Sequence, residues 1–468
     1  MTLLSVGSNG LVRQPKPMPF PFGPSTIANI LEEGVANHPN RLALIDGDET
    51  WTYAELEAVV AAQATNDATP TSVTWHDAHR ASAALVIGVL ADLRAGRIWV
   101  ASKTEPDMSA FSGLTAAGTD ALHPDSPAIV AFTSGTTGEP KRVVHSHRGA
   151  LLPAVVSSDV EPPAEGERIG TPLDLRIGNV MILGPLSAFV RRGTFVVMRD
   201  HSASGMAADI ERHNITRLIA VPTLAYDLVE GEGVHPEQLA SLDRVILGGG
   251  GARPEMLQSF TDRFGVRPTL SYGLSEAPTG VVRESLDDPI GSGKGHPLPH
   301  VEVVITNPET GEQLPIGEVG EVCLRSASSG LWANTWTGTL GYLGDPEATK
   351  QLFRDGLLHT GDVGVVDIEG RVAITGRLSQ VIIRGGQNVY PEAVRRTLLL
   401  NSSVADAHVV GYPDERLGEG IGAAIVLVDG TDFLSFSGYG LDKVVILDEL
   451  PRNHMGKVAG LPDDLFAD

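Results

Sequence analysis

The stretch Ala128–Lys141, AIVAFTSGTTGEPK, runs from a short apolar strand directly into a loop rich in glycine and hydroxyl side chains. Gly135 and Gly138 allow tight backbone turns, and four hydroxyls together with backbone NH groups can surround phosphate oxygens. Lys141 adds a positive charge. The loop is not the GxxxxGK[ST] loop of P-loop NTPases, because only two residues separate its glycines and the lysine lies three positions after the second. The composition predicts a phosphate-binding loop of another type; a flexible surface loop is the alternative.

Short β-rich apolar runs alternate with helical patterns on the C-terminal side of this loop. The runs are RLIAV at 217–221, RVILGG at 244–249 and PTLSYG at 268–273, and stretches such as PEMLQSFTDRFG lie between them. Strands separated by helix-length segments indicate a buried, largely parallel sheet with helices on its faces. After Leu298, runs such as HVEVVITN are joined by polar, glycine-containing turns, which predicts an accessory antiparallel β subdomain.

A separate α+β unit is predicted from Ser379 onward. There a strand, QVIIRG, is followed by a glycine-rich loop and by a helix that Pro391 opens. A chain of 468 residues is also too long for one compact core. We therefore predict an α/β fold. A large N-terminal domain of mostly parallel sheets, helices and a β subdomain occupies 1–378, and a small α+β domain occupies 379–468.

The composition restricts the classes of partner and compartment. A formal net charge of -23 repels phosphate backbones and anionic headgroups, so we expect no nucleic-acid partner and no membrane-surface binding. The single cysteine, Cys323, excludes an intrachain disulfide and a Cys-based zinc site, and it suits a reducing compartment. The apolar stretch Ala81–Val100 contains Asp92, Arg94 and Arg97, which argues against a membrane span. The first residues lack the order of a secretory signal, so we expect a soluble, cytoplasmic protein.

The string TSGTTGxPK at 133–141 is very similar to the phosphate loop of the adenylate-forming superfamily, which includes acyl-CoA ligases, luciferases and the adenylation domains of peptide synthetases. Four further motifs follow in family order. The resemblance implies an enzyme that uses ATP to activate a carboxylic acid. Arg142 departs from the pattern, because glycine is usual there. The residues that the resemblance assigns to the nucleotide phosphates are Thr133, Ser134, Gly135, Thr136, Thr137, Gly138 and Lys141.

The second motif, SYGLSE, ends at Glu276 and resembles the family's YGxTE segment. By resemblance, Tyr272 lies against the adenine, Ser275 meets the α-phosphate and Glu276 binds Mg²⁺, with the Thr133 hydroxyl near the same ion. A carboxylate is a hard ligand that suits Mg²⁺, and the metal neutralises triphosphate charge. The alternative for Glu276 is a solvated loop carboxylate.

The third and fourth motifs resemble the ribose site and the hinge of the family. In LHTGD, the resemblance implies that Asp362 accepts hydrogen bonds from both ribose hydroxyls. In GRLSQ, Arg377 is expected at the ribose or a phosphate, where it would supply a charge-assisted hydrogen bond. Ser379 occupies the hinge position, where the family usually has Asp or Lys. The resemblance thus implies a small domain that rotates about Ser379.

The last motif, LPRNHMGK, ends at Lys457 and resembles the family's PRxxxGK segment. The lysine of that segment bridges the attacking carboxylate and the α-phosphate. An ammonium aimed at charge that develops on the transferring group stabilises the transition state more than the ground state. A lone lysine at such a position is otherwise more often solvated. The predicted catalytic residues are Lys457, Glu276 and Lys141.

Two glycine-rich loops are softer signals. LGGGGA at 247–252 joins a strand to a helix, and its small residues leave room for the adenine and an acyl group. RGGQN at 384–388 resembles the loop that lines a channel for a pantetheine thiol; a plain turn is the alternative. The nucleotide contacts predicted here are Gly250 and Gly273. The predicted acyl-site residues are Gly248, Gly249, Gly251, Ala252, Gly273 and Ala277, and those of the thiol channel are Arg384, Gly385 and Gly386.

These assignments predict a two-step reaction. The acid attacks the α-phosphate of Mg-ATP to give acyl-adenylate and pyrophosphate, and rotation of the small domain then admits the thiol of CoA. The expected product is a thioester, and the chain is predicted to be an AMP-forming acyl-CoA ligase.

Two alternatives stay open. One is a stand-alone adenylation enzyme that loads an acyl or amino acid onto the phosphopantetheine of a carrier protein, with Asp174 pairing with a substrate amino group. The other is a non-catalytic nucleotide- or acyl-binding protein. It is motivated by segments at 63–72 and 431–440 that are short for the family. The sequence does not identify the acid.

Overall fold

The computed structural model describes residues 6–12, 19–66, 73–114, 123–133, 140–428, 436, 438–451, 458, 461–462 and 465–466. The chain forms two compact units. Unit 1 comprises Met1–Val303 and Cys323–Thr360, and unit 2 comprises Val304–Val322 and Gly361–Asp468. Three strands carry the chain across the boundary: β14 (Val301–Thr306), β15 (Gly320–Ser326) and β18 (Leu357–Val366). The hinge predicted at Ser379 lies inside unit 2 and stays a prediction.

The helical segments of unit 1 begin at residues that suit helix starts. Ser82 and Ser202 accept hydrogen bonds from the first turns of α3 and α7, and Pro254 occupies the first turn of α9. The helix α9 ends at Gly265, whose φ of 73° favours glycine. The described helical segments of unit 1 are η1 (Ile27–Asn29), α1 (Glu32–Asn37), α2 (Tyr53–Asn66), α3 (Ala83–Arg94), η2 (Met108–Phe111), α4 (His147–Val160), α5 (Gly178–Met181), η4 (Ile182–Leu186), α6 (Ser187–Val190), α7 (Ala203–His213), α8 (Pro222–Glu230), η5 (Pro236–Leu239), α9 (Pro254–Phe264) and α10 (Pro346–Leu352).

Unit 1 is built on a nine-stranded sheet of mixed direction. Its order is β13-β12-β11-β10-β9-β7-β8-β1-β2, and the strands from β11 to β1 run parallel. The flanking strands β2, β12 and β13 pair antiparallel. The predicted α/β class with a largely parallel sheet is confirmed. The strands are β1 (Leu42–Asp46), β2 (Glu49–Thr52), β7 (Arg168–Thr171), β8 (Thr194–Val197), β9 (Arg217–Ala220), β10 (Arg244–Gly248), β11 (Pro268–Leu274), β12 (Ala277–Arg283) and β13 (His296–Pro297).

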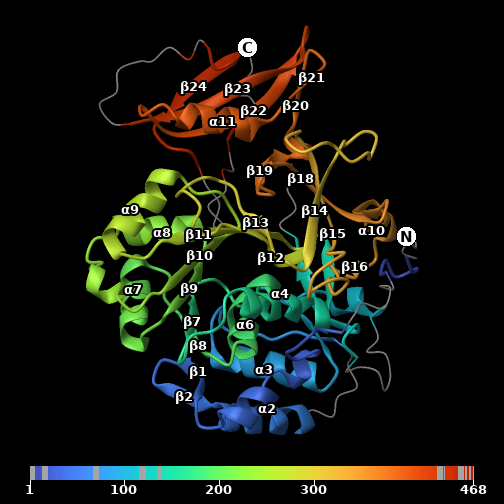
Figure 1. Ribbon diagram of the computed structural model, residues 1–468, viewed down its shortest axis with the longest axis vertical. Helices are drawn as coiled ribbons and strands as arrows, with labels where there is room; N and C mark the ends of the chain where they lie inside the picture. The colour runs from blue at the N-terminus through green and yellow to red at the C-terminus, as the bar shows by residue number, and fades with distance from the viewer. Residues whose placement is uncertain are drawn as a thin grey trace. The chain divides into compact units, whose positions relative to one another are not determined.

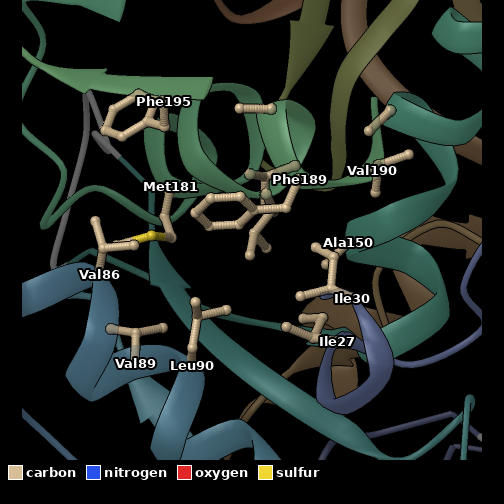
Figure 2. Close-up of a cluster of buried hydrophobic side chains, with 14 of the residues drawn as sticks. Ile27, Ile30, Val86, Val89, Leu90, Ala150, Met181, Phe189, Val190 and Phe195 are labelled. Carbon is tan, nitrogen blue, oxygen red and sulfur yellow. The ribbon is translucent and has the colours of Figure 1, made fainter. Parts of the chain in front are cut away.

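Neighbouring residues of these strands supply apolar side chains to opposite faces of the sheet. Phe195 and Ile219 join the core under α3, α4 and α6, whereas Val196 and Leu218 join the core under α7, α8 and α9. Figure 1 shows α7, α8 and α9 along one side of the sheet and α4 and α6 on the other. Figure 2 shows the first core, where Phe195 of β8 lies near Phe189 of α6. Helices on both faces leave the strand ends as the place for a site.

A second, five-stranded sheet of unit 1 carries the predicted phosphate loop. Its order is β16-β6-β5-β4-β3, with β5 antiparallel to β6 and β6 antiparallel to β16. The apolar run that precedes the loop forms β5, as predicted. The strands are β3 (Val73–Thr74), β4 (Ile98–Val100), β5 (Pro127–Phe132), β6 (Arg142–Ser146) and β16 (Gly341–Tyr342), and β17 (Phe353–Arg354) pairs separately with β18.

Unit 2 contains a hairpin and a second α+β layer. The hairpin joins β18 to β19 (Val372–Arg377), and η6 (Leu378–Gln380) follows it. The α+β layer has the sheet order β21-β20-β23-β22, with β24 parallel to β23 and α11 packed on the apolar core of the sheet. The helix predicted at Pro391 is confirmed as α11. These elements are β20 (Ile382–Arg384), β21 (Gln387–Val389), α11 (Pro391–Leu399), β22 (Val404–Asp414), β23 (Gly418–Leu427) and β24 (Lys443–Leu447).

Candidate active site

The two ends of the predicted phosphate loop are tied to each other. Thr133 follows β5 and Lys141 precedes β6, and the Thr133 NH donates to the Lys141 carbonyl at 3.1 Å. In return, the Lys141 NH donates to Oγ1 of Thr133 at 3.1 Å. The β5–β6 pairing therefore continues to the base of the loop. The side chain of Arg142 is bound outside the loop, because its guanidinium donates to the carbonyl of Ala110 at 2.8 Å. The predicted phosphate contacts Ser134, Gly135, Thr136, Thr137 and Gly138 lie outside the described residues.

Glu276 lies in a two-residue turn between β11 and β12, where Leu274 pairs with Ala277. Its side chain is partly exposed, and its Oε1 accepts a hydrogen bond of 2.6 Å from the Tyr342 hydroxyl. Its backbone carbonyl accepts from the NH of Thr339 at 2.8 Å. No other side chain among the described residues bonds to its Oε2. The carboxylate is thus fixed at one oxygen while the other oxygen is available.

Tyr342 connects the predicted residues Glu276 and Lys141. The ammonium Nζ of Lys141 lies 4.6 Å from the centroid of the Tyr342 ring, a distance typical of a cation–π contact. Sequence reasoning missed Tyr342, because the segment GYLGDPEAT carries no catalytic pattern that a single chain reveals. The only local signal was a tyrosine after a glycine in an apolar stretch. The contacts show that both predicted residues share one neighbour.

His145 is a fully buried side chain near Ser275, in the turn between β11 and β12. Burial lowers its pKa to about 4, an effect that the nearby backbone of Ser275 only partly offsets. Neither ring nitrogen has a hydrogen-bond partner within the part of the chain that the structure describes. His145 is therefore neutral at physiological pH and adds no charge to the region of Ser275.

The glycine run after β10 borders open space. In the parallel register, Gly248 lies beside Ser271 at the carboxyl ends of β10 and β11, where ligands bind in open α/β sheets. A Cβ added at Gly250 or Gly251 would have no atom within 4 Å, and Gly249 adopts a φ of 79°. The run is exposed up to Ala252, which packs against the core of the sheet instead.

The remaining predicted contacts of unit 1 lie on neighbouring strands. Tyr272 is partly buried in β11, where its backbone pairs with Val282, and Gly273 follows it in the same strand. Ala277, the first residue of β12, is only 2% exposed. Ala277 thus contributes mainly to the core, while Tyr272 lies on the strand end that continues to Ser275.

The two predicted ribose residues form an ion pair within unit 2. Asp362 and Arg377 are partners in the β18–β19 register, and Nε of Arg377 lies 2.9 Å from Oδ1 of Asp362. Asp362 is buried, whereas the Arg377 side chain is half exposed. Ser379 follows in η6 and is exposed. The structure therefore places Asp362 and Arg377 side by side, and their contacts with the ribose or a phosphate stay a prediction.

The predicted thiol-channel loop is a tight, exposed turn of unit 2. Gly385 and Gly386 join β20 to β21 with φ values of 57° and 80°, which favour glycine. Arg384 donates two hydrogen bonds to Asp442, at 2.8 and 2.6 Å. These bonds lower the pKa of the Asp442 carboxyl. Lys457, the predicted catalytic lysine, lies outside the described residues.

The donor set at Glu276 and Thr133 fits a hard divalent cation. A carboxylate oxygen and a hydroxyl oxygen are the ligands that Mg²⁺ prefers, and it takes few protein ligands when phosphates supply the rest. Oε2 of Glu276 is available, and Thr133 carries a hydroxyl oxygen at the base of the phosphate loop.

Comparison with known proteins identifies a family and several named relatives. The sequence pattern of the family described as AMP-binding enzyme matches residues 65–331. A putative acyl-CoA ligase, YdaB, from Bacillus subtilis (strain 168) is 33% identical over 353 residues, which cover 73% of this chain and 68% of the relative. The fatty acid–[acyl-carrier-protein] ligase ScoC from Streptomyces coeruleorubidus is 31% identical over 364 residues, or 72% of this chain and 66% of the relative.

The fold has close structural neighbours. The crystal structure of ATP-bound MatB from Rhodopseudomonas palustris matches with a TM-score of 0.78 over 92% of this chain and 97% of that chain. The sequence identity in this match is 23%, so the likeness shows a shared fold alone. Among the described residues, no helix is long and apolar enough to span a membrane.

Proposed function

The chain belongs to the family of AMP-binding enzymes, and from this membership we propose that it works as an AMP-forming acid–thiol ligase. A carboxylate oxygen of the acid attacks the α-phosphorus of ATP, the bond to the β-phosphate breaks, and acyl-AMP and pyrophosphate form. The sulfur of a thiol then attacks the acyl carbon, AMP leaves, and the thiol proton is released. The products are a thioester and AMP.

The contact series Thr133–Lys141–Tyr342–Glu276 is the observation that carries this proposal. It joins the base of the phosphate loop to the carboxylate at the end of β11. Glu276 and Thr133 would hold Mg²⁺, which would neutralise part of the triphosphate charge when bound. Lys141 would add a positive charge beside the same phosphates. A site that binds a triphosphate needs such local charges, because the chain as a whole is strongly acidic.

The nucleotide would bind along the carboxyl ends of β10 and β11. The open space at Gly250 and Gly251 would admit a flat base, and Tyr272 of the neighbouring strand β11 would stack its ring against it. Asp362 would accept hydrogen bonds from the ribose hydroxyls, and Arg377 would add a charge-assisted bond. Asp362 and Arg377 already lie side by side as an ion pair, which would place both beside the ribose.

Lys457 would supply the ammonium for the first half-reaction, and the Gly385–Gly386 turn would border the thiol in the second. Rotation about Ser379 would exchange the two, so one small domain would complete both sites. We take CoA as the thiol. The relative ScoC bears the name of an acyl-carrier-protein ligase, which makes a carrier-protein phosphopantetheine the second candidate acceptor. The cytoplasm, where ATP and free thiols coexist, is the proposed compartment.

An amino acid is a less favoured substrate. Asp174, the aspartate that would pair with its amino group, is already engaged by Arg176. The guanidinium donates to both carboxylate oxygens, at 3.0 and 2.9 Å, and the Arg176 NH donates to Oδ1 at 3.0 Å. A substrate ammonium would have to displace this pair.

The test is acid-dependent release of pyrophosphate from Mg-ATP, with fatty, aryl and amino acids and with or without CoA. We expect at least one acid to release pyrophosphate and the Lys457→Ala variant to lose about two to three orders of magnitude of rate. The control, Lys350→Ala, removes an exposed lysine that pairs with Glu347 and should not change the rate. If ATP binds but no acid releases pyrophosphate, the chain is a nucleotide-binding protein and the proposed reaction is wrong.

A further inference from the structure

We propose that Tyr342 is a positioning residue of this site, one that holds the Glu276 carboxylate for a metal–nucleotide complex and supports Lys141 through its ring. The inference rests on the proposed function, because it assigns Glu276 to the cation. It goes beyond the sequence motifs, none of which includes Tyr342. The role needs three properties: a rigid tyrosine, a directed bond to the carboxylate and a separate contact with the lysine.

The backbone of Tyr342 is rigidly held. Gly341 and Tyr342 form β16, in register with Val144 and Val143 of β6, and the NH of Leu343 donates to the Arg142 carbonyl at 2.9 Å. The short strand therefore lies along the strand that leaves the phosphate loop. Because β6 and β16 are paired, a displacement of the loop base would also displace Tyr342.

The side chain of Tyr342 has little freedom. It is 7% exposed, and its backbone NH donates to Oγ1 of Thr349 at 2.9 Å. Thr349 is fully buried in α10, whose first turn is capped by Asp345. A tyrosine fixed at backbone and ring has few rotamers available, so its hydroxyl occupies one place.

The hydroxyl directs the carboxylate. A phenol–carboxylate bond of 2.6 Å is short for an O–H···O bond and typical of a charged acceptor. The Thr339 NH holds the Glu276 carbonyl from the same segment, three residues before Tyr342. The segment 339–342 thus fixes Glu276 at both backbone and side chain. With Oε1 occupied, the available oxygen for a cation is Oε2.

The ring has a separate role. The Lys141 side chain is exposed and rests 4.6 Å from the ring centroid, so the ring restrains an otherwise flexible cation beside the loop. Tyr342→Phe keeps this ring and removes only the bond to Glu276. Tyr342→Leu removes both. The two substitutions therefore separate the role of Tyr342 in metal binding from its role in binding the nucleotide phosphates.

The experiment measures Mn²⁺ binding by electron paramagnetic resonance in the presence of a non-hydrolysable ATP analogue, together with the Mg²⁺ dependence of pyrophosphate release. For Tyr342→Phe we expect the half-saturating metal concentration to rise about tenfold, the size of one lost charge-assisted hydrogen bond. Affinity for the metal-free analogue should stay within about twofold. In Tyr342→Leu, affinity for the metal-free analogue should fall as well, because Lys141 loses its support.

Two further variants make the result decisive. Tyr53→Phe removes a buried tyrosine hydroxyl that donates to the Gly193 carbonyl at 2.8 Å, so it controls for lost stability without touching the site. Glu276→Gln should lower the affinity for the metal more than Tyr342→Phe does. In a Glu276→Gln background, Tyr342→Phe should add little further loss, because the hydroxyl acts through the carboxylate.

The outcomes separate the inference from the proposed function. If Glu276→Gln weakens metal binding and Tyr342→Phe binds metal like the wild type, the role of Tyr342 is wrong and the metal assignment stands. The role of Tyr342 is equally wrong if Tyr342→Phe, like Tyr53→Phe, changes only thermal stability. If Glu276→Gln has no effect on the metal, the proposed function has lost its metal site. The wild type could also release no pyrophosphate while Tyr342→Phe still weakens metal binding. That result would overturn the proposed reaction but support the positioning role of Tyr342.

Discussion

Three buried histidines of unit 1 are expected to give its stability a marked pH dependence. Burial lowers the pKa of His145 and His147 to about 4 and that of His300 to about 3, from an ordinary value of 6.5. As pH falls through 6.5, these histidines bind protons in the unfolded chain but not in the folded one. Stability is therefore lost from pH 6.5 downward, until the folded rings of His145 and His147 protonate near pH 4 and that of His300 near pH 3.

His145→Leu should remove its share of this loss. The leucine carries no group that titrates, and both ring nitrogens of His145 lack partners among the described side and main chains. At pH 5 the variant should be about 2 kcal/mol more stable relative to wild type than at pH 8. Between these pH values the histidine of the unfolded wild type gains a proton, whereas the folded one, with a pKa of about 4, stays mostly neutral. Urea unfolding at both pH values measures it. His201→Leu, at an exposed position, is the control, and an equal pH response in the two variants would refute the account.

At the scale of elements, the two-residue strand β16 depends on a glycine. Gly341 has a φ of 119°, and a Cβ there would lie 2.7 Å from the Gly10 carbonyl oxygen and 2.7 Å from Cγ2 of Thr349. No side chain fits without moving the backbone. A change at this position should therefore act on the neighbouring Tyr342 as well as on stability.

Gly341→Ala should destabilise unit 1 by about 2–4 kcal/mol, because it combines backbone strain with a steric clash. Gly47→Ala is a matched control: Gly47 also has a positive φ, 63°, but a Cβ there would meet nothing within 4 Å. The control should lose only about 1 kcal/mol. Denaturant unfolding of the two variants tests the difference, and equal losses would mean that the clash at Gly341 relaxes freely.

Elements with a strong local pattern could be predicted from the sequence. The strands β5, β10 and β11 are apolar runs, and α9 has proline at its start and glycine at its end, so local rules suffice for them. The strand β16 has two residues and no period, and it forms only because a distant strand offers an edge. Tyr342 could not be predicted for the same reason, because its role depends on a contact with Glu276, 66 positions earlier in the chain.

At the scale of the whole molecule, the proposed rotation about Ser379 predicts a separation of the two half-reactions. Ser379→Pro fixes φ and restricts the preceding residue in the middle of η6, whereas Ser379→Ala leaves the backbone free. We expect the proline variant to form thioester at least about tenfold more slowly while pyrophosphate release changes little. The alanine variant should resemble wild type. Equal slowing of both steps by proline would place the hinge elsewhere.

Rapid-quench measurements of acyl-AMP and thioester in single turnovers distinguish these cases. Accumulated acyl-AMP in Ser379→Pro would indicate that the first step is intact and the second is blocked. Absence of acyl-AMP would show that the substitution disturbs the first step, contrary to the prediction.

Unit 2 is assembled from two separate stretches of the chain, 304–322 and 361–468. No single cut in the gene yields it whole, and an exchange of coding segments between relatives at one crossover would pair parts of unit 2 from different parents. Recombination at Ser379 would keep the hairpin β18–β19, with Asp362 and Arg377, on the parent that provides unit 1. The residues proposed for the ribose would thus be inherited together with the phosphate loop, and separately from Lys457.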